Sequence, residues 1–338
     1  MPVMTVSWLT DPSRSIEING STQRICSVVF AEDGKQVFSG GDEGVVRRWR
    51  VDDGHAVGEP IRAEGAEVLT AAVSPDGKWL VCGLRRLSSN DGTANLRVWD
   101  TQTNEKVLDI KGHTGSAFAV DVSPDSTKLA TGSSDKTACI WNITTGERLV
   151  GPLQHDGRGV VAVRFSPKGD RLATATAAED SKDEKTAKSI RIYDSDNGQQ
   201  LVLFDIPFMV ALNMTVLAWT SDGRQLFAAS YSQVKQFDTS SGSLLKGWPV
   251  SGGGWLGSVV LSRNQKFIVV TANKSLSFWD TSTHRQIGTV IPHTSNLWWI
   301  ALSPNNDQIA TGEENGKVTL RNLYNILPVS YLTVNVSN

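Results

Sequence analysis

Histidine, cysteine and acidic side chains are the groups in this 338-residue sequence that could bind a metal ion or act as acids, bases and nucleophiles. The five histidines stand singly along the chain, at His55, His113, His155, His284 and His293. No two of them have the His-x-x-x-His spacing that places two imidazoles on one helix face as zinc ligands. We therefore expect no metal site and no catalytic histidine.

The three cysteines, Cys26, Cys82 and Cys139, each lie inside an apolar run, and none belongs to a Cys-x-x-Cys pair. An odd number of isolated cysteines argues against a disulfide framework, so we expect buried, reduced thiols. Residues 1–10 contain no basic segment followed by an apolar stretch, and no run approaches the ~18 apolar residues of a membrane span. These features predict a cytoplasmic protein, with a nuclear location as the alternative.

One short motif resembles an enzyme signature. Gly40-Gly41-Asp42-Glu43 is similar to a signature of cyclic-dinucleotide synthases, which need a mixed α/β domain around it. Here the motif comes just before the short apolar run that ends at Trp49, and we interpret it as a hairpin turn. Neither a phosphate-binding Gly-x-x-x-x-Gly-Lys-Ser/Thr loop nor a Gly-x-Ser-x-Gly nucleophile turn occurs. We therefore expect no enzyme activity and no cofactor.

The charged residues are balanced: 33 Lys and Arg stand against 35 Asp and Glu, for a net charge of −2. A protein that binds nucleic acid or an anionic membrane generally carries a basic excess or a basic stripe. The totals supply no such excess, so neither nucleic acid nor a membrane is expected as a partner.

A short phrase recurs along the chain: an apolar residue followed by Ser-Pro-Asp-Gly or a degraded form of it. Clear copies are Val73–Gly77 and Val122–Asp125. Counted at the Asp position, the seven copies fall at residues 33, 76, 125, 168, 222, 264 and 305. Alternating apolar residues that end in an aromatic and a polar residue follow each copy, as in Leu96–Asp100. The last of these runs, Val318–Asn322, lacks the aromatic.

Each repeat has the chemistry of strands and turns. Its short runs alternate or are rich in β-branched residues, and Gly, Asn, Asp and Ser separate them. In Ser-Pro-Asp-Gly, Pro presets φ and Gly tolerates a positive φ, as a tight turn requires. A single four-stranded sheet cannot bury both of its faces, whereas radial stacking of seven sheets buries them. The sequence therefore predicts one all-β domain over residues 1–338, a seven-bladed β-propeller with four-stranded antiparallel blades.

These phrases resemble the WD-repeat family. The Trp-Asp pair stands at Trp99-Asp100 and Trp279-Asp280, and its partner Gly-His is complete at Gly112-His113. The resemblance extends from about Ile16 to Asn322, and the family's own period is about 40–45 residues. It implies a propeller whose blades are braced by a hydrogen-bonded tetrad.

Blade three matches the family's tetrad best. The resemblance assigns the four roles to His113, Ser133, Asp135 and Trp141. Blade seven keeps His293 but has Asn315 and Arg321 in place of the acid and the indole, and blades five and six lack the histidine. These departures imply looser bracing in blades five to seven.

Two segments compete for the last strand of blade seven. In the family an N-terminal strand commonly completes the last blade, and Ser13–Ile18 is placed to do so. Val329–Val334 also fits the outer-strand position by its spacing. Both cannot fill one slot, and we favour the N-terminal strand.

Two insertions fall between the second and third strands of their blades, Leu84–Asn90 in blade two and Glu179–Lys185 in blade four. In the family this connection lies on the top face, so both loops are expected to rise from that face. Loops on one face of a repeat protein often form its binding side. Arg85 and Arg86 are contact candidates, whereas the charged loop of blade four is expected to be solvated.

Alignment of the inner strands places two variable positions near the top rim. Large rings at these positions, such as Phe118 and Trp298, depart from the family's small polar residues. Aromatic and Arg side chains commonly anchor protein interfaces, although such rings could instead fill the channel or pack between blades. The predicted partner-binding set is Arg24, Glu67, Arg85, Arg86, Phe118, Asn213, Trp255 and Trp298.

The repeat and its rim together predict a non-catalytic scaffold, monomeric in isolation, that binds a partner protein or peptide on the top face. The alternative is a small-ligand binder or hydrolase with its site in the central channel. Convergent Asp, Glu and His side chains in the channel would favour the alternative. An apolar rim studded with Arg would favour the scaffold.

Overall fold

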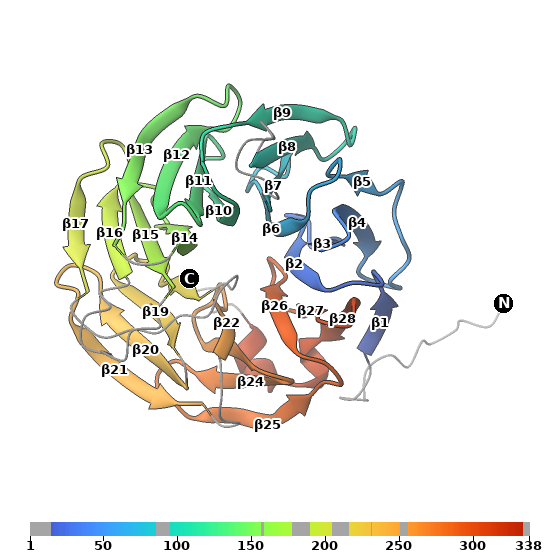
Figure 1. The fold of residues 1–338 in the computed structure, drawn as a ribbon. Coiled ribbons are helices and arrows are strands. Elements are labelled where there is room, and N and C mark those ends of the chain that lie inside the picture. The colour runs from blue at the N-terminus through green and yellow to red at the C-terminus, as the bar shows by residue number, and fades with distance from the viewer. Residues whose placement is uncertain are drawn as a thin grey trace.

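The computed structural model describes residues 15–85, 95–156, 159–177, 190–204, 216–230, 232–250 and 256–333. These residues form seven four-stranded sheets that stand around a central axis as the blades of a propeller (Figure 1). Neighbouring strands are antiparallel, so the predicted fold, an all-β seven-bladed propeller with four-stranded antiparallel blades, is confirmed. No helix in the described residues has the length and apolar character needed to cross a membrane.

Each blade runs from an inner strand beside the axis to an outer strand at the rim. Blades one to three consist of β2 to β5 (Ile25–Phe30, Gln36–Gly41, Val45–Arg50, Ile61–Arg62), β6 to β9 (Val68–Val73, Trp79–Leu84, Leu96–Asp100, Lys106–Ile110) and β10 to β13 (Ala117–Val122, Lys128–Ser133, Thr137–Asn142, Arg148–Gln154). Blades four to six consist of β14 to β17 (Val160–Phe165, Arg171–Thr176, Ile190–Asp194, Gln200–Leu203), β18 to β21 (Leu217–Trp219, Gln225–Ser230, Gln233–Asp238, Leu244–Pro249) and β22 to β25 (Leu256–Leu261, Phe267–Ala272, Ser275–Asp280, Gln286–Pro292). Blade seven combines β26 (Leu297–Leu302), β27 (Gln308–Glu313) and β28 (Lys317–Asn322) with β1 (Ser15–Asn19).

The recurring Ser-Pro-Asp-Gly phrase forms the turn between the first and second strands of a blade. In blade two, the Ser74 hydroxyl accepts the backbone N–H of Trp79 at 2.8 Å and donates to Asp76 Oδ1 at 2.5 Å. Gly77 has a φ of +73°, and Ser126 takes +61° at the corresponding turn of blade three, where the glycine is missing. We call the face that carries these turns the bottom face, and the opposite face, where the inner strands begin, the top face.

A glycine recurs in the second strand where neighbouring blades come closest. A Cβ added to Gly132 would lie 2.7 Å from Val160 Cγ1 of the next blade, and a Cβ added to Gly83 would lie 2.7 Å from the carbonyl oxygen of Ala117 in the next blade. The interface between blades therefore leaves no room for a side chain at this position. A Cβ added to Gly312 of blade seven would likewise lie 2.7 Å from Ile25 Cγ2 of blade one, so the same packing joins the two ends of the ring.

The ring is closed by the N-terminal strand. β1 pairs antiparallel with β28 over residues 15–19 and 317–321. The Lys317 ammonium donates to Glu17 Oε2 at 2.7 Å across this pair. The predicted N-terminal closure, placed over Ser13–Ile18, is confirmed for its described residues.

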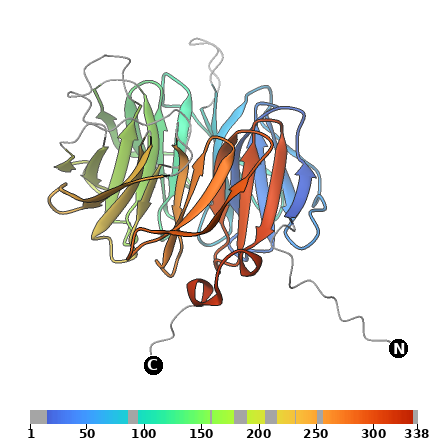
Figure 2. The same ribbon diagram turned by 90° about the horizontal axis from the view of Figure 1, so that it is seen from below.

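The C-terminal segment lies under the blades and adds no strand in its described part. After the short helix η1 (Leu323–Asn325), α1 spans Val329–Leu332, so the described part of the alternative strand predicted over Val329–Val334 is a helix and not a strand. The Tyr331 hydroxyl donates to Asp280 Oδ2 at 2.7 Å and ties α1 to blade six. Figure 2 shows both helices on the bottom face.

The recurring glycine predicts the effect of a single substitution. We expect Gly132→Val to lower the free energy of unfolding by about 1–3 kcal/mol, because its side chain would overlap Val160 in a closely packed interface. Urea unfolding of the purified variants measures the change. Gly247→Ala in β21 is the control, because its Cβ would meet no atom nearer than 3.8 Å. An equal, small effect of both substitutions would contradict the packing argument.

Candidate protein-interaction face

Arg24 and Trp298 form a contact on the top face. Arg24 precedes β2 of blade one, and Trp298 lies near the start of β26 in blade seven. The guanidinium carbon of Arg24 lies 4.5 Å from the centroid of the Trp298 ring, a cation–π arrangement. The contact exists because the closed ring makes blades one and seven neighbours. Two predicted interface residues from opposite ends of the chain are thus brought together.

Asp42 holds the guanidinium of this pair in place. Arg24 Nη2 donates to Asp42 Oδ1 at 3.0 Å, and the Cys26 thiol lies 3.3 Å from the same oxygen. Burial raises the pKa of the Cys26 thiol to about 12, so the thiol remains protonated at neutral pH. The indole N–H of Trp298 is buried and has no acceptor among the described residues.

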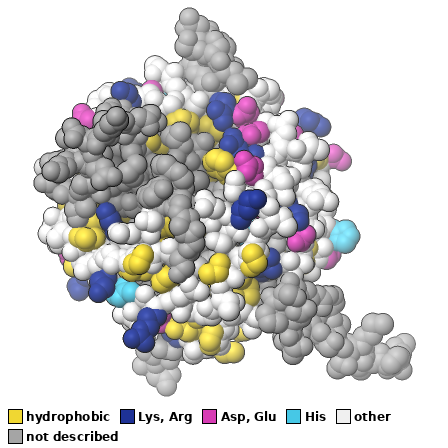
Figure 3. Space-filling view, turned by 60° about the horizontal axis from the view of Figure 1, so that its bottom comes forward, with side chains coloured by type: hydrophobic (Ala, Val, Ile, Leu, Met, Phe, Trp, Pro, Cys, Tyr) yellow, Lys and Arg dark blue, Asp and Glu magenta, His cyan; other side chains and the backbone are white. Residues whose placement is uncertain are grey.

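Glu67 and Arg85 form an ion pair at the top of blade two, and their side chains are each about one-third exposed. The backbone N–H of Arg85 also donates to the carbonyl oxygen of Glu67, at 2.9 Å. The two predicted interface residues therefore neutralise each other. In Figure 3, basic and acidic side chains lie side by side on the molecular surface, with hydrophobic side chains next to them.

Phe118 lies between two blades. Its side chain is partly buried against the core, and a Cβ added to Gly159, just before the next inner strand, would lie 3.2 Å from Phe118 Cε2. This placement corresponds to the structural alternative considered for the rim aromatics. The other three predicted interface residues, Arg86, Asn213 and Trp255, lie outside the described residues.

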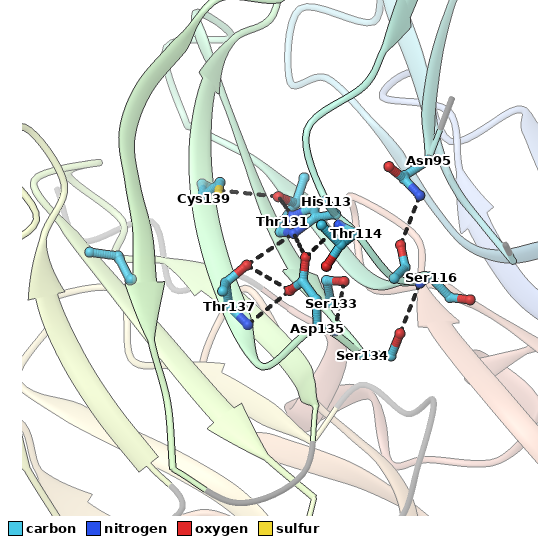
Figure 4. Close-up of polar contacts among 12 residues, drawn as sticks. Asn95, His113, Thr114, Ser116, Thr131, Ser133, Ser134, Asp135, Thr137 and Cys139 are labelled. Carbon is cyan, nitrogen blue, oxygen red and sulfur yellow. Dashed lines mark hydrogen bonds and ion pairs between the residues drawn. The ribbon is translucent and has the colours of Figure 1, made fainter. Parts of the chain in front are cut away.

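The bracing network of blade three joins an indole, a hydroxyl, an imidazole and a carboxylate. Figure 4 shows the last three groups, on Thr131, His113 and Asp135. Trp141 Nε1 donates to Thr131 Oγ1 at 2.8 Å, and His113 Nε2 lies 2.7 Å from the same oxygen. His113 Nδ1 lies 3.0 Å from Asp135 Oδ2. Every member is buried or nearly so, and each polar atom named here has a partner.

The hydroxyl in this network is Thr131, which corrects the assignment to Ser133. The two residues lie on the same face of β11, but Ser133 is the last residue of the strand. Its hydroxyl accepts the backbone N–H of Asp135 at 3.1 Å within the following turn. Thr131 lies one side-chain layer further in, where the indole and imidazole meet.

The carboxylate of Asp135 is the charged end of the network. Burial alone would raise its pKa, but His113 and Thr137 outweigh burial and hold the pKa well below the usual range. Thr137 Oγ1 donates at 2.7 Å and the backbone N–H of Thr114 donates at 2.8 Å. These donors satisfy the carboxylate within the protein, which favours a structural role.

Comparison with known proteins agrees with this geometry. A family model described as "WD domain, G-beta repeat" matches residues 12–50, 58–100, 104–142 and 284–322. The chain contains WD repeats at these four positions. The first three matched segments contain β1 to β12, and the last contains β25 to β28.

Three relatives illustrate the range of WD-repeat proteins that this chain resembles. It is 33% identical to Protein groucho of Drosophila melanogaster over 154 residues, which cover 44% of this chain and 19% of groucho. It is 24% identical to Periodic tryptophan protein 2 of Arabidopsis thaliana, over 75% of this chain and 26% of the relative. It is 26% identical to Eukaryotic translation initiation factor 3 subunit I of Pyricularia oryzae, over 66% of this chain and 82% of the relative. The chain thus spans only about a fifth to a quarter of the first two proteins.

Blade seven departs from the WD-repeat tetrad but contains a buried pair of its own. His293 Nδ1 lies 3.0 Å from Glu313 Oε1, and Thr319 Oγ1 donates to the same oxygen at 2.9 Å. Glu313 occupies the position of Ser133 in blade three and was not among the predicted bracing residues. An acidic residue at the end of the second strand, in a blade that keeps the histidine of the repeat, is the signal that could have identified it. Asn315, at the acid's usual position, accepts the local backbone N–H of Lys317 at 3.2 Å.

The assignment of Thr131 predicts unequal effects of two neighbouring substitutions. We expect Thr131→Val to lower the free energy of unfolding by about 1–3 kcal/mol, because it leaves the buried N–H of Trp141 without an acceptor. Ser133→Ala removes one acceptor at a turn and is the matched control. Chemical unfolding of both variants measures the difference, and a greater loss for Ser133→Ala would show that the other hydroxyl carries the network.

His155 of blade four predicts a loss of stability in mild acid. Burial, together with the charge of Arg191, lowers the pKa of His155 to about 4, below the value of about 6.5 of an unfolded chain. The unfolded state therefore binds a proton between these pH values and the folded state does not. As pH falls from 7 to 4, we expect the wild type to lose up to about 3 kcal/mol more than a His155→Gln variant, which cannot gain this proton. Parallel unfolding curves across the range measure the difference, and curves with the same pH dependence would contradict it.

Proposed function

We propose that this WD-repeat protein is a non-catalytic scaffold that binds a partner protein or peptide on its top face. The contact between Arg24 and Trp298 carries the proposal. Trp and Arg are the residue types most enriched among the side chains that dominate binding energy at protein interfaces. Here they form one unit on the top face, preset by Asp42, so little side-chain freedom remains to be lost on binding.

The neighbouring blade adds polar complementarity. The ion pair of Glu67 and Arg85 lies on the same face, partly exposed. Such pairs at the edge of an interface contribute chiefly to specificity and to the rate of association. Arg86, Asn213 and Trp255 complete the proposed contact set on sequence grounds, and Phe118 supports this face from between two blades.

A scaffold role also agrees with what the relatives are called. Eukaryotic translation initiation factor 3 subunit I is, by its name, one subunit of a larger factor. We extend to this chain only the general idea of a propeller that assembles with other proteins. A cytoplasmic or nuclear location fits the three buried free thiols, because reducing compartments keep cysteines in this form.

The central channel supports the scaffold over a hydrolase. In the described part of the channel, the acidic side chain lining the cavities is Asp121, which is paired with Arg164 at 2.8 Å. The backbone N–H of Phe165 donates to its other oxygen at 2.7 Å. A carboxylate engaged at both oxygens is poorly placed to accept a proton from a substrate.

The proposal is tested by capturing partners with wild-type protein and with Arg24→Ala, Trp298→Ala and the double variant. We expect partners found with the wild type to be lost with the double variant, and at least a tenfold weaker affinity for a purified partner. Leu201→Ala on an exposed outer strand is the control, since it removes an apolar side chain away from the top face. Melting temperatures establish that the variants are folded. Equal capture by wild type and double variant would refute the proposal.

A further inference from the structure

A cavity of about 520 Å³ opens at the bottom end of the central channel, on the face opposite the proposed interaction face. Its wall consists of the lower ends of the inner strands β10, β14, β18 and β22 and the turns that follow them. Pro75, Pro124 and Pro167 of the recurring turns form part of the lining. Further up the channel, between Thr70 and Trp299, the next cavity among the described residues has a volume of only about 10 Å³, room for about one water. The bottom cavity is therefore the larger of these two spaces along the described part of the channel.

Most of the pocket wall is apolar. Ala218, Val260 and Leu261 line it and are partly exposed, so water occupies apolar surface that a ligand could cover. Trp219 adds its ring, while its indole N–H is already used: it donates to the carbonyl oxygen of Arg164 at 3.1 Å. Arg171 covers one face of this ring, with its guanidinium carbon 5.0 Å from the centroid. The wall thus offers aliphatic and aromatic carbon to a guest.

The charged groups of the pocket offer donors to a guest. Both oxygens of Asp121 are engaged, by Arg164 Nη1 at 2.8 Å and by the backbone N–H of Phe165 at 2.7 Å. The side chain of Asp121 is 15% exposed, whereas that of Arg164 is 33% exposed and that of Arg263 at the edge is 60% exposed. Arg263 pairs with Glu32 outside the pocket at 2.8 Å. The polar surface that remains is guanidinium N–H, which matches carboxylate geometry.

The ion pair of Asp121 with Arg164 joins the inner strands of blades three and four. At the equivalent position of the inner strand, the other five blades have small apolar residues: Val29, Ala72, Ala218, Val260 and Ala301. A pair of charges is not needed to build this part of a blade, because those five blades form without one. It places a guanidinium beside an apolar pocket at one point of the ring.

From this arrangement we propose that the bottom pocket binds an extended peptide segment of a partner protein that inserts a Leu- or Phe-sized side chain beside Trp219 and sets a neighbouring Asp or Glu side chain on Arg164 and Arg263. The guanidinium groups of Arg164 and Arg263 favour an acidic peptide segment over a basic one. The apolar wall favours a ligand that buries an apolar side chain over a small free anion. This site is separate from the top-face site and does not depend on it. Two partners, or two segments of one partner, could then occupy opposite faces of the same disc.

The test is a selection of random heptapeptides on the whole chain, with counter-selection against Val260→Trp, which fills the pocket from a partly exposed wall position. We expect the enriched peptides to share Leu or Phe next to Asp or Glu. A fluorescein-labelled peptide from the selection should bind the wild type at least tenfold more tightly than Val260→Trp in anisotropy titrations. A copy of the peptide with Lys in place of its acidic residues should lose binding to a similar degree.

Three further variants make the result specific. The double variant Asp121→Asn/Arg164→Gln replaces the two charged side chains by neutral ones. It should weaken peptide binding at least threefold. Ala218→Leu, a smaller filling substitution, replaces Val260→Trp if the latter does not fold. Trp298→Ala on the top face should leave peptide affinity unchanged, so failure of the top-face proposal and failure of this one are distinguishable.

Several outcomes would overturn the proposal. One is that no peptide is enriched over the filled variant; another is that the enriched peptides are basic or lack an acidic residue. A third is self-association of the wild type in sedimentation that Val260→Trp abolishes, because the occupant would then be a second copy of this chain. Binding of inorganic phosphate that competes with the peptide at equal concentration would show that the pocket is an anion site without selectivity for the side chain.

Discussion

Closure of the ring is the constraint on which the rest of this structure depends. A four-stranded blade cannot bury both faces by itself, so each needs a neighbour on either side, including the first and the last. The backbone pairing of β1 with β28 and the contact of Gly312 with Ile25 supply the missing neighbour. The top-face contact of Arg24 with Trp298 forms at this same junction. The proposed interaction face is thus a product of the closure.

The bracing networks show how the blades vary within one architecture. Blade three uses His113, Thr131, Asp135 and Trp141, whereas blade seven buries His293 against Glu313 and Thr319. In both, a buried histidine lies against a carboxylate that also accepts a hydrogen bond from a threonine hydroxyl, Thr137 in blade three and Thr319 in blade seven. In blade seven the second ring nitrogen of His293 and the second oxygen of Glu313 are buried without a partner among the described residues, so this blade is less fully satisfied. The acidic partner of the histidine is kept, although it moves from the turn to the strand. A comparison of motif letters alone does not detect such an exchange.

The two faces of the disc differ in chemistry. The top face presents a stacked aromatic with paired charges, and the bottom end of the channel presents an apolar pocket with a guanidinium at its side. The two sites proposed here would therefore select different partner segments. These two sites lie at opposite ends of the central channel.

The sequence by itself determined the repeat, the turns, the seven antiparallel blades and the N-terminal closure. These depend on neighbouring residues: Ser74 and Gly77 shape a turn from within it, and alternation assigns each strand its buried face. Only the tertiary structure decided that Thr131 carries the network, that Glu313 pairs with His293, and that Asp121 meets Arg164 across two blades. Each of these choices depends on how deep a side chain lies in its strand and on which strand of the next blade lies opposite. That information comes from the packing of whole sheets, which no short stretch of sequence contains.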